Sequence, residues 1–175
     1  MSTKPWILGA VLIGLPWLAG CGYTRHAVLP QNIKSIYVEN VKNEIPLSQV
    51  YVYQPGLEMA ITKALVRRFN RDGNLRVAPT ADQADAILKS SLRDFEQEGL
   101  RFTSLESVEE YRLFIVVSLR LIDARSKKVI WEEPSFSGDA EYFVSNVRSV
   151  AREEATQRAI ERLARNVVDR VVEDW

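Results

Sequence analysis

A strict alternation of side chains along residues 111–123 is the feature that most constrains the fold. One set of alternate positions is wholly apolar: Tyr111, Leu113, Ile115, Val117, Leu119 and Leu121. The other set is mixed: Arg112, Phe114, Val116, Ser118 and Arg120. A period of two is that of a β-strand. The segment therefore predicts a long strand in a sheet that is covered on one face only.

Two amphipathic helices are predicted beside this strand. The longer occupies residues 146–173, where an apolar stripe recurs at three- and four-residue spacing and charges of alternating sign fill the other side. The shorter starts near Pro55, which suits a first helical turn, and continues to about Phe69. Gly73 ends it, since glycine readily takes the left-handed conformation.

The rest of the pattern is assigned by propensity and by turn residues. Strands are expected at residues 33–40, 75–77 and 129–142 and in the first ten residues of 86–98. A helical turn is expected at 81–84, and loops at 41–53 and 99–108. Pro134 and Gly138 mark a bulge or an edge in the last strand. The polar residues 123–128 turn the chain into an antiparallel hairpin.

These elements predict an α+β fold. A mostly antiparallel sheet of four or nearly four strands carries both amphipathic helices on one face, because that arrangement buries both stripes and the apolar side of the sheet.

The first 20 residues are predicted to be a lipoprotein signal peptide. Lys4 precedes an uncharged apolar run of 12 residues, 6–17, which is shorter than the about 20 residues that span a bilayer. The run leads into Leu18-Ala19-Gly20-Cys21, with small residues before a cysteine. This ending resembles the bacterial lipobox, in which cleavage precedes a lipidated cysteine. A membrane-spanning anchor is the less favoured alternative.

Lipidation of Cys21 would fix the protein to a membrane surface, since two acyl chains suffice for stable anchoring. Gly22 lacks the aspartate that retains enteric-type lipoproteins in the inner membrane, so the periplasmic side of the outer membrane is expected. Residues 21–32 form a tether and 33–175 a single domain. Removing residues 1–20 leaves 155 residues with a net charge of −1.

Composition excludes several kinds of function. The 23 basic and 23 acidic side chains balance, which argues against a nucleic-acid binder that relies on bulk positive charge. A lone cysteine and a lone histidine, His26, exclude internal disulfides and leave little for metal or triad chemistry. Adjacent glutamates such as Glu109 and Glu110 point to opposite faces of a strand. We expect no enzyme, no cofactor and no metal.

Cations on the predicted strands are the candidate binding residues. Lys89, Ser91 and Arg93 share a face if residues 87–95 form a strand, and Arg112, Ser118 and Arg120 share one with Phe114 and Val116. Cations beside apolar groups suit a ligand with phosphate and acyl parts. The alternative is that they are the solvated side of the sheet, with stems lying over neighbouring residues.

The order of short motifs resembles the LptE family of lipopolysaccharide-assembly lipoproteins over residues 18 to about 172. The likeness rests on Cys21-Gly22-Tyr23, Leu29-Pro30, residues 36–40, Leu57-Glu58, Ala64-Leu65, Ala84-Asp85-Ala86, Val117-Ser118-Leu119, Asp123, Ile130-Trp131 and an alanine-rich last helix.

The resemblance implies an α/β sandwich that plugs the outer-membrane β-barrel LptD, assists its assembly and helps deliver lipopolysaccharide to the outer leaflet. It implies lipid contacts by basic residues of the sheet. Arg93 and Arg120 are the first candidates here, with Lys89 and Arg112 beside them. The alternative is a generic outer-membrane lipoprotein scaffold or an auxiliary subunit of an ABC-type envelope transporter.

Overall fold

The structure, a computed structural model, describes residues 33–46, 55–105, 107–144 and 148–172. The predicted signal peptide and the whole predicted tether, including Cys21 and His26, lie outside these residues. In chain order the elements are β1 (Ser35–Val38), β2 (Lys42–Asn43), α1 (Leu57–Asp72), β3 (Arg76–Val77), a 3-10 turn η1 (Ala81–Gln83), β4 (Ala86–Phe102), β5 (Val108–Asp123), β6 (Val129–Phe143) and α2 (Arg148–Val172).

The strands form one six-stranded sheet in the order β3-β1-β4-β5-β6, with β2 also paired to β4. Strands β4, β5 and β6 are antiparallel neighbours, whereas β1 runs parallel to both β3 and β4. The α+β class is confirmed, but the sheet is mixed and has six strands in place of the four or nearly four that the sequence predicted. A parallel pair needs a crossover connection, and here α1 lies in the chain between β1 and its two parallel partners.

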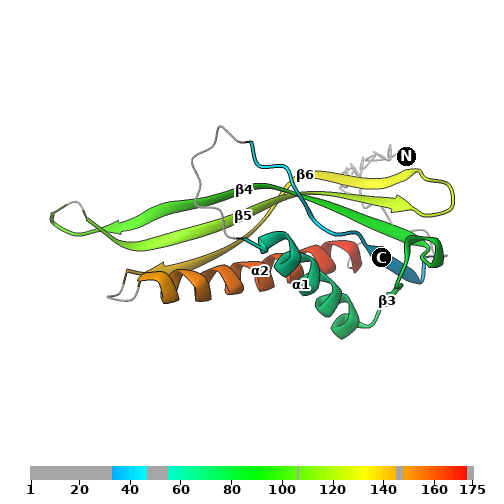
Figure 1. The fold of residues 1–175 in the computed structure, drawn as a ribbon, viewed down its shortest axis with the longest axis horizontal. Helices are drawn as coiled ribbons and strands as arrows, with labels where there is room; N and C mark the ends of the chain where they lie inside the picture. Colours follow the sequence, from blue (N-terminus) through cyan, green and yellow to red (C-terminus); the bar gives the residue numbers. More distant parts are fainter. Residues whose placement is uncertain (1–32, 47–54, 106, 145–147, 173–175) are drawn as a thin grey trace, which may run out of the picture.

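Both helices cover the same side of the sheet (Figure 1). The apolar face predicted for β5 is the core face: its residues from Leu113 to Leu121 are buried at every second position. They pack with the buried stripe of α2, which includes Ala159 and Leu163, and with Phe69 of α1. On the opposite side of the sheet, here called the open face, none of the described residues forms a helix (Figure 1).

Gly56 and Gly73 bound α1, both with left-handed backbone angles, φ 86° and 82°. The predicted end is confirmed, with the Gly73 N–H donating to the Phe69 carbonyl at 3.1 Å. The helix starts at Leu57 instead of Pro55. In the described ranges, no helix is both long and apolar enough to cross a membrane.

Two segments predicted as loops contain strand. Lys42 and Asn43 form β2 inside 41–53, and β4 and β5 extend through both ends of 99–108. Here Gly99 pairs with Tyr111 and Phe102 with Val108, so the backbone hydrogen bonds of the long hairpin continue despite weak local propensity. The hairpin tip projects beyond the helices (Figure 1).

Strand β6 is an edge strand with a bulge, as Pro134 predicted. The partners of Val117 and Leu119 are Phe136 and Glu133, so Pro134 and Ser135 together lie opposite one residue of β5. Gly138 has a different role, because α2 crosses its backbone closely. A Cβ built there would lie 2.5 Å from the Ala159 carbonyl oxygen.

Asp85 joins β1 to the start of β4. Its carboxylate accepts hydrogen bonds from the Ser35 hydroxyl at 2.8 Å and from the Lys34 N–H at 3.1 Å. These bonds, the Ser35 hydroxyl first, lower the pKa of Asp85.

Ser90→Ala and Ser35→Ala are expected to change stability in opposite directions. Both serines are buried, 4% and 3% exposed, but the Ser90 hydroxyl finds no hydrogen-bond partner among the residues that the structure describes. Removing an unpaired buried hydroxyl should raise the free energy of unfolding by about 1 kcal/mol, whereas removing the bonded one should lower it by about 1–2 kcal/mol. Urea unfolding of the two variants measures both, and a loss of stability in Ser90→Ala equal to that in Ser35→Ala would contradict the assignment.

Candidate functional site

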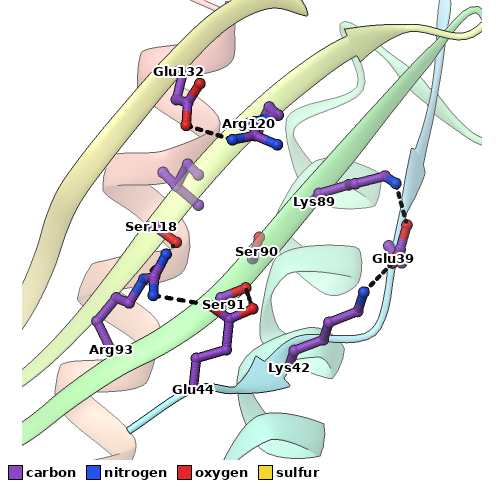
Figure 2. A pocket seen from close by; sticks show the side chains of 11 residues that line it. Glu39, Lys42, Glu44, Lys89, Ser90, Ser91, Arg93, Ser118, Arg120 and Glu132 are labelled. Carbon is purple, nitrogen blue, oxygen red and sulfur yellow. Dashed lines mark hydrogen bonds and ion pairs between the residues drawn. The ribbon is translucent and has the colours of Figure 1, made fainter. Parts of the chain in front are cut away.

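The open face holds a pocket of about 280 Å³ near the middle of the sheet, here called the sheet-face pocket (Figure 2). Strands β4 and β5 and the β1–β2 segment supply most of its walls. Its lining residues are Glu39, Lys42, Glu44, Lys89, Ser90, Ser91, Arg93, Ser118, Leu119, Arg120 and Glu132. Three of the four predicted ligand-binding cations, Lys89, Arg93 and Arg120, therefore meet at one site.

Arg93 lies in this pocket at a bulge of β4. Leu92 pairs with Val117 and Asp94 with Val116, which leaves Arg93 as the extra residue between them. The guanidinium Nε donates to the Ser118 hydroxyl at 3.1 Å. The bulge also changes the alternation, so that Phe95 turns into the core, where it is 5% exposed.

Arg112, the fourth predicted residue, lies elsewhere on the open face. It is six positions before Ser118 on β5, which corresponds to about 20 Å along a strand. Its guanidinium pairs with Glu141 and lies 3.9 Å from Asp139, and the hydrogen bond to Glu141 raises its pKa. Phe114 and Val116, both half-buried, separate Arg112 from the pocket.

Each cation of the sheet-face pocket is paired with a carboxylate of the same pocket (Figure 2). The N···O distances are 3.5 Å for Lys42–Glu39, 3.6 Å for Lys89–Glu39, 2.8 Å for Arg93–Glu44 and 2.7 Å for Arg120–Glu132. The hydrogen bond between Arg120 and Glu132 raises the pKa of the arginine and lowers that of the glutamate.

Four cations against three carboxylates give the pocket a formal charge of +1. Glu39 is 28% exposed and the other paired side chains are at least 41% exposed, so each pair stabilises the fold only weakly and can exchange for a ligand. An anion that enters must displace carboxylates from the arginines. The arrangement suits binding of a charged group and offers no nucleophile with an adjacent base.

The sequence did not indicate Lys42 or the three glutamates as site residues. Lys42 and Glu44 lie in 41–53, which is predicted as a loop, whereas Glu39 and Glu132 lie in predicted strands. The spacing Lys42–Glu44 is a short alternation, but it is too brief to indicate a strand without the pairing to Ser91 and Leu92. Within the part of the chain that the structure describes, no group of three or more acidic, histidine or cysteine side chains is arranged to hold a metal.

Comparison with known proteins shows the family to which the chain is similar. The family model described as LptE, Lipopolysaccharide-assembly, matches residues 33–174. No curated protein matches the chain.

Several solved structures share the fold. A protein from Xanthomonas campestris is 16% identical, with a TM-score of 0.63, over 83% of this chain and 87% of that one. A lipoprotein from Caulobacter crescentus is 13% identical, with a TM-score of 0.51, over 81% and 91%. Uncharacterized lipoprotein B from Nitrosomonas europaea is 16% identical, with a TM-score of 0.51, over 82% and 86%.

Proposed function

The chain belongs to the LptE family of lipopolysaccharide-assembly lipoproteins, and from this membership we propose that it is an outer-membrane lipoprotein that plugs an LptD-type β-barrel. In that place it assists barrel assembly and the insertion of lipopolysaccharide into the outer leaflet. The observation that carries the proposal is the family match over residues 33–174. The family is non-enzymatic, so binding and assembly are the activities expected.

The anchor in this proposal is lipidated Cys21 on the periplasmic side of the outer membrane. Gly22 after the cysteine supports that location, since it lacks the aspartate of inner-membrane retention.

Exposed apolar side chains at one end of the sheet support contact with a barrel wall. Phe102 is 58%, Leu105 85% and Phe143 58% exposed. Phe102 and Leu105 belong to the projecting β4–β5 hairpin, and Phe143 ends the neighbouring β6. Large apolar groups that gather on a surface favour a protein or lipid partner.

The sheet-face pocket is the proposed lipopolysaccharide site. Its arginines match phosphate oxygens with their fork of donors. Phe114 and Val116 lie beside it on the same open face and offer apolar surface to acyl chains. Arg93, Arg120 and Lys89 are the primary contacts in this proposal, and Arg112 is a separate contact beyond the apolar pair.

Reversing two charges of this pocket should weaken lipopolysaccharide binding. The double variant Arg93→Glu/Arg120→Glu removes two hydrogen-bond donors and places two new carboxylates beside Glu44 and Glu132. We therefore expect the affinity for lipopolysaccharide to fall at least about tenfold. Binding is measured with the purified mature chain and labelled lipopolysaccharide, with folding checked by circular dichroism.

The matched control is Lys63→Glu/Arg76→Glu, which makes the same charge change at exposed positions outside the pocket. Equal weakening in both variants would remove the pocket assignment and leave the plug proposal standing. The plug proposal is tested by purifying the tagged chain in mild detergent. A stoichiometric β-barrel partner supports it, and co-purification with an inner-membrane transporter instead supports the auxiliary-subunit alternative.

A further inference from the structure

A second basic site lies on the helical side of the molecule, between α1 and α2. Figure 1 shows α1 crossing the C-terminal half of α2. At this crossing is a groove of about 130 Å³, here called the arginine groove. Three arginines of α1 and one of α2 line it: Arg67, Arg68, Arg71 and Arg165.

Helix geometry explains why these arginines gather. Positions 64, 67, 68 and 71 are three, four and seven residues apart, so they share one side of α1. Ala64 and Ala164 are buried, 4% and 2% exposed, and their small side chains let the helices approach closely. The longer arginine side chains then surround the place where Ala64 and Ala164 bring the two helices together.

The charges in the arginine groove are less compensated than those of the sheet-face pocket. Arg68 pairs with Asp169 at 3.0 Å. Arg67, Arg71 and Arg165 make no ion pair with any residue that the structure describes, and Glu161 is the one acidic side chain in the lining. Four arginines against Glu161 and Asp169 give a formal charge of +2.

We propose that the arginine groove binds a phosphate group, either free or carried by a lipid headgroup. A phosphate dianion matches the local charge of +2, and its oxygens can accept hydrogen bonds from several guanidinium groups together. The small volume fits a phosphate group and leaves the remainder of the ligand outside the groove. No carboxylate has to leave Arg67, Arg71 or Arg165 before the anion binds, unlike the situation in the sheet-face pocket.

Calorimetric titration of the purified mature chain in an uncharged detergent tests this proposal without a barrel or lipopolysaccharide. The titrants are inorganic pyrophosphate and dihexanoyl phosphatidic acid, with dihexanoyl phosphatidylcholine as the lipid control. Binding of pyrophosphate supports recognition of a free phosphate group, and binding of phosphatidic acid alone supports a lipid headgroup. Absence of binding by both overturns the proposal.

The variant Arg67→Gln/Arg71→Gln/Arg165→Gln should reduce that affinity at least about tenfold, because three charged donors are lost. The matched control is Lys63→Gln/Arg76→Gln/Lys128→Gln, which removes three exposed cations outside the groove. Equal affinity in the two variants, both shown to be folded by thermal unfolding, overturns the site. Since neither probe is lipopolysaccharide, failure here leaves the proposed function untouched.

Discussion

Gly138→Ala is expected to lower the free energy of unfolding by about 3 kcal/mol. The added methyl carbon would lie 2.5 Å from the Ala159 carbonyl oxygen and 2.6 Å from the Leu163 backbone nitrogen. These are backbone atoms of α2, so no side chain can rotate away to make room. The helix must move off the sheet, which loosens its buried stripe against β5 and β6. Chemical denaturation followed by far-ultraviolet circular dichroism measures the change.

Gly99→Ala is the matched control, since it adds the same methyl group to the same kind of element. The new carbon would meet only side chains there, Phe102 at 3.0 Å and Val108 at 3.3 Å. Phe102 is exposed and can swing outward, so we expect a change below about 1 kcal/mol. Similar losses in the two variants would show that close contact with α2 is not what requires glycine at position 138.

Cys21→Ala is expected to abolish maturation of the protein. The thioether that carries the first lipid needs a thiol, and signal cleavage at a lipobox follows that modification. The variant should therefore accumulate as an uncleaved precursor that carries no lipid. Mass spectrometry of the purified variant, with metabolic labelling by a fatty-acid analogue, measures both effects.

His26→Ala serves as the control for this substitution, because it changes a residue of the predicted tether and leaves the lipobox intact. It should be cleaved and lipidated as the unaltered chain is. Normal processing of Cys21→Ala would reject the lipobox and with it the proposed anchor.

Local patterns predicted the elements with long periodic sequences. The alternation along β5 identified both its faces, and Pro134 located the bulge of β6. The parallel pairing of β1 was not predictable in the same way. The side chains of Ser35–Val38 alternate in the same way whether the neighbouring strand is parallel or antiparallel. The relative direction of β1 and β4 depends on the path of the chain through α1, which lies between them. The strand ends at Gly99 and Phe102 depend on cross-strand hydrogen bonds that no local propensity records.

Of the sheet-face pocket, the sequence predicted three of the cations but not the carboxylates that pair with them. The alternation along each strand indicates which face carries Lys89 and which carries Arg120. Their meeting depends on the pairing of β4 with β5, in which Lys89 lies opposite Arg120, and that pairing was not predicted. Arg93 shares the face of Lys89 by the same alternation, whereas Glu39 and Glu44 come from a segment 45 or more residues before Lys89. The arginine groove was not predicted, because it forms only where α1 and α2 pack together. The arginines of each helix, taken alone, look like ordinary solvated side chains.

Crosslinking from both sides of the molecule tests the plug most directly. A photoreactive residue replaces one exposed side chain at a time: Glu96 or Ser137 on the open face, and Lys63 or Gln157 on the helices. A chain surrounded by a barrel should crosslink to the same β-barrel protein from both sets of positions, in cells and without overexpression. Crosslinks to a barrel from one side alone, or to no barrel from either side, would contradict the proposal that this lipoprotein sits inside one.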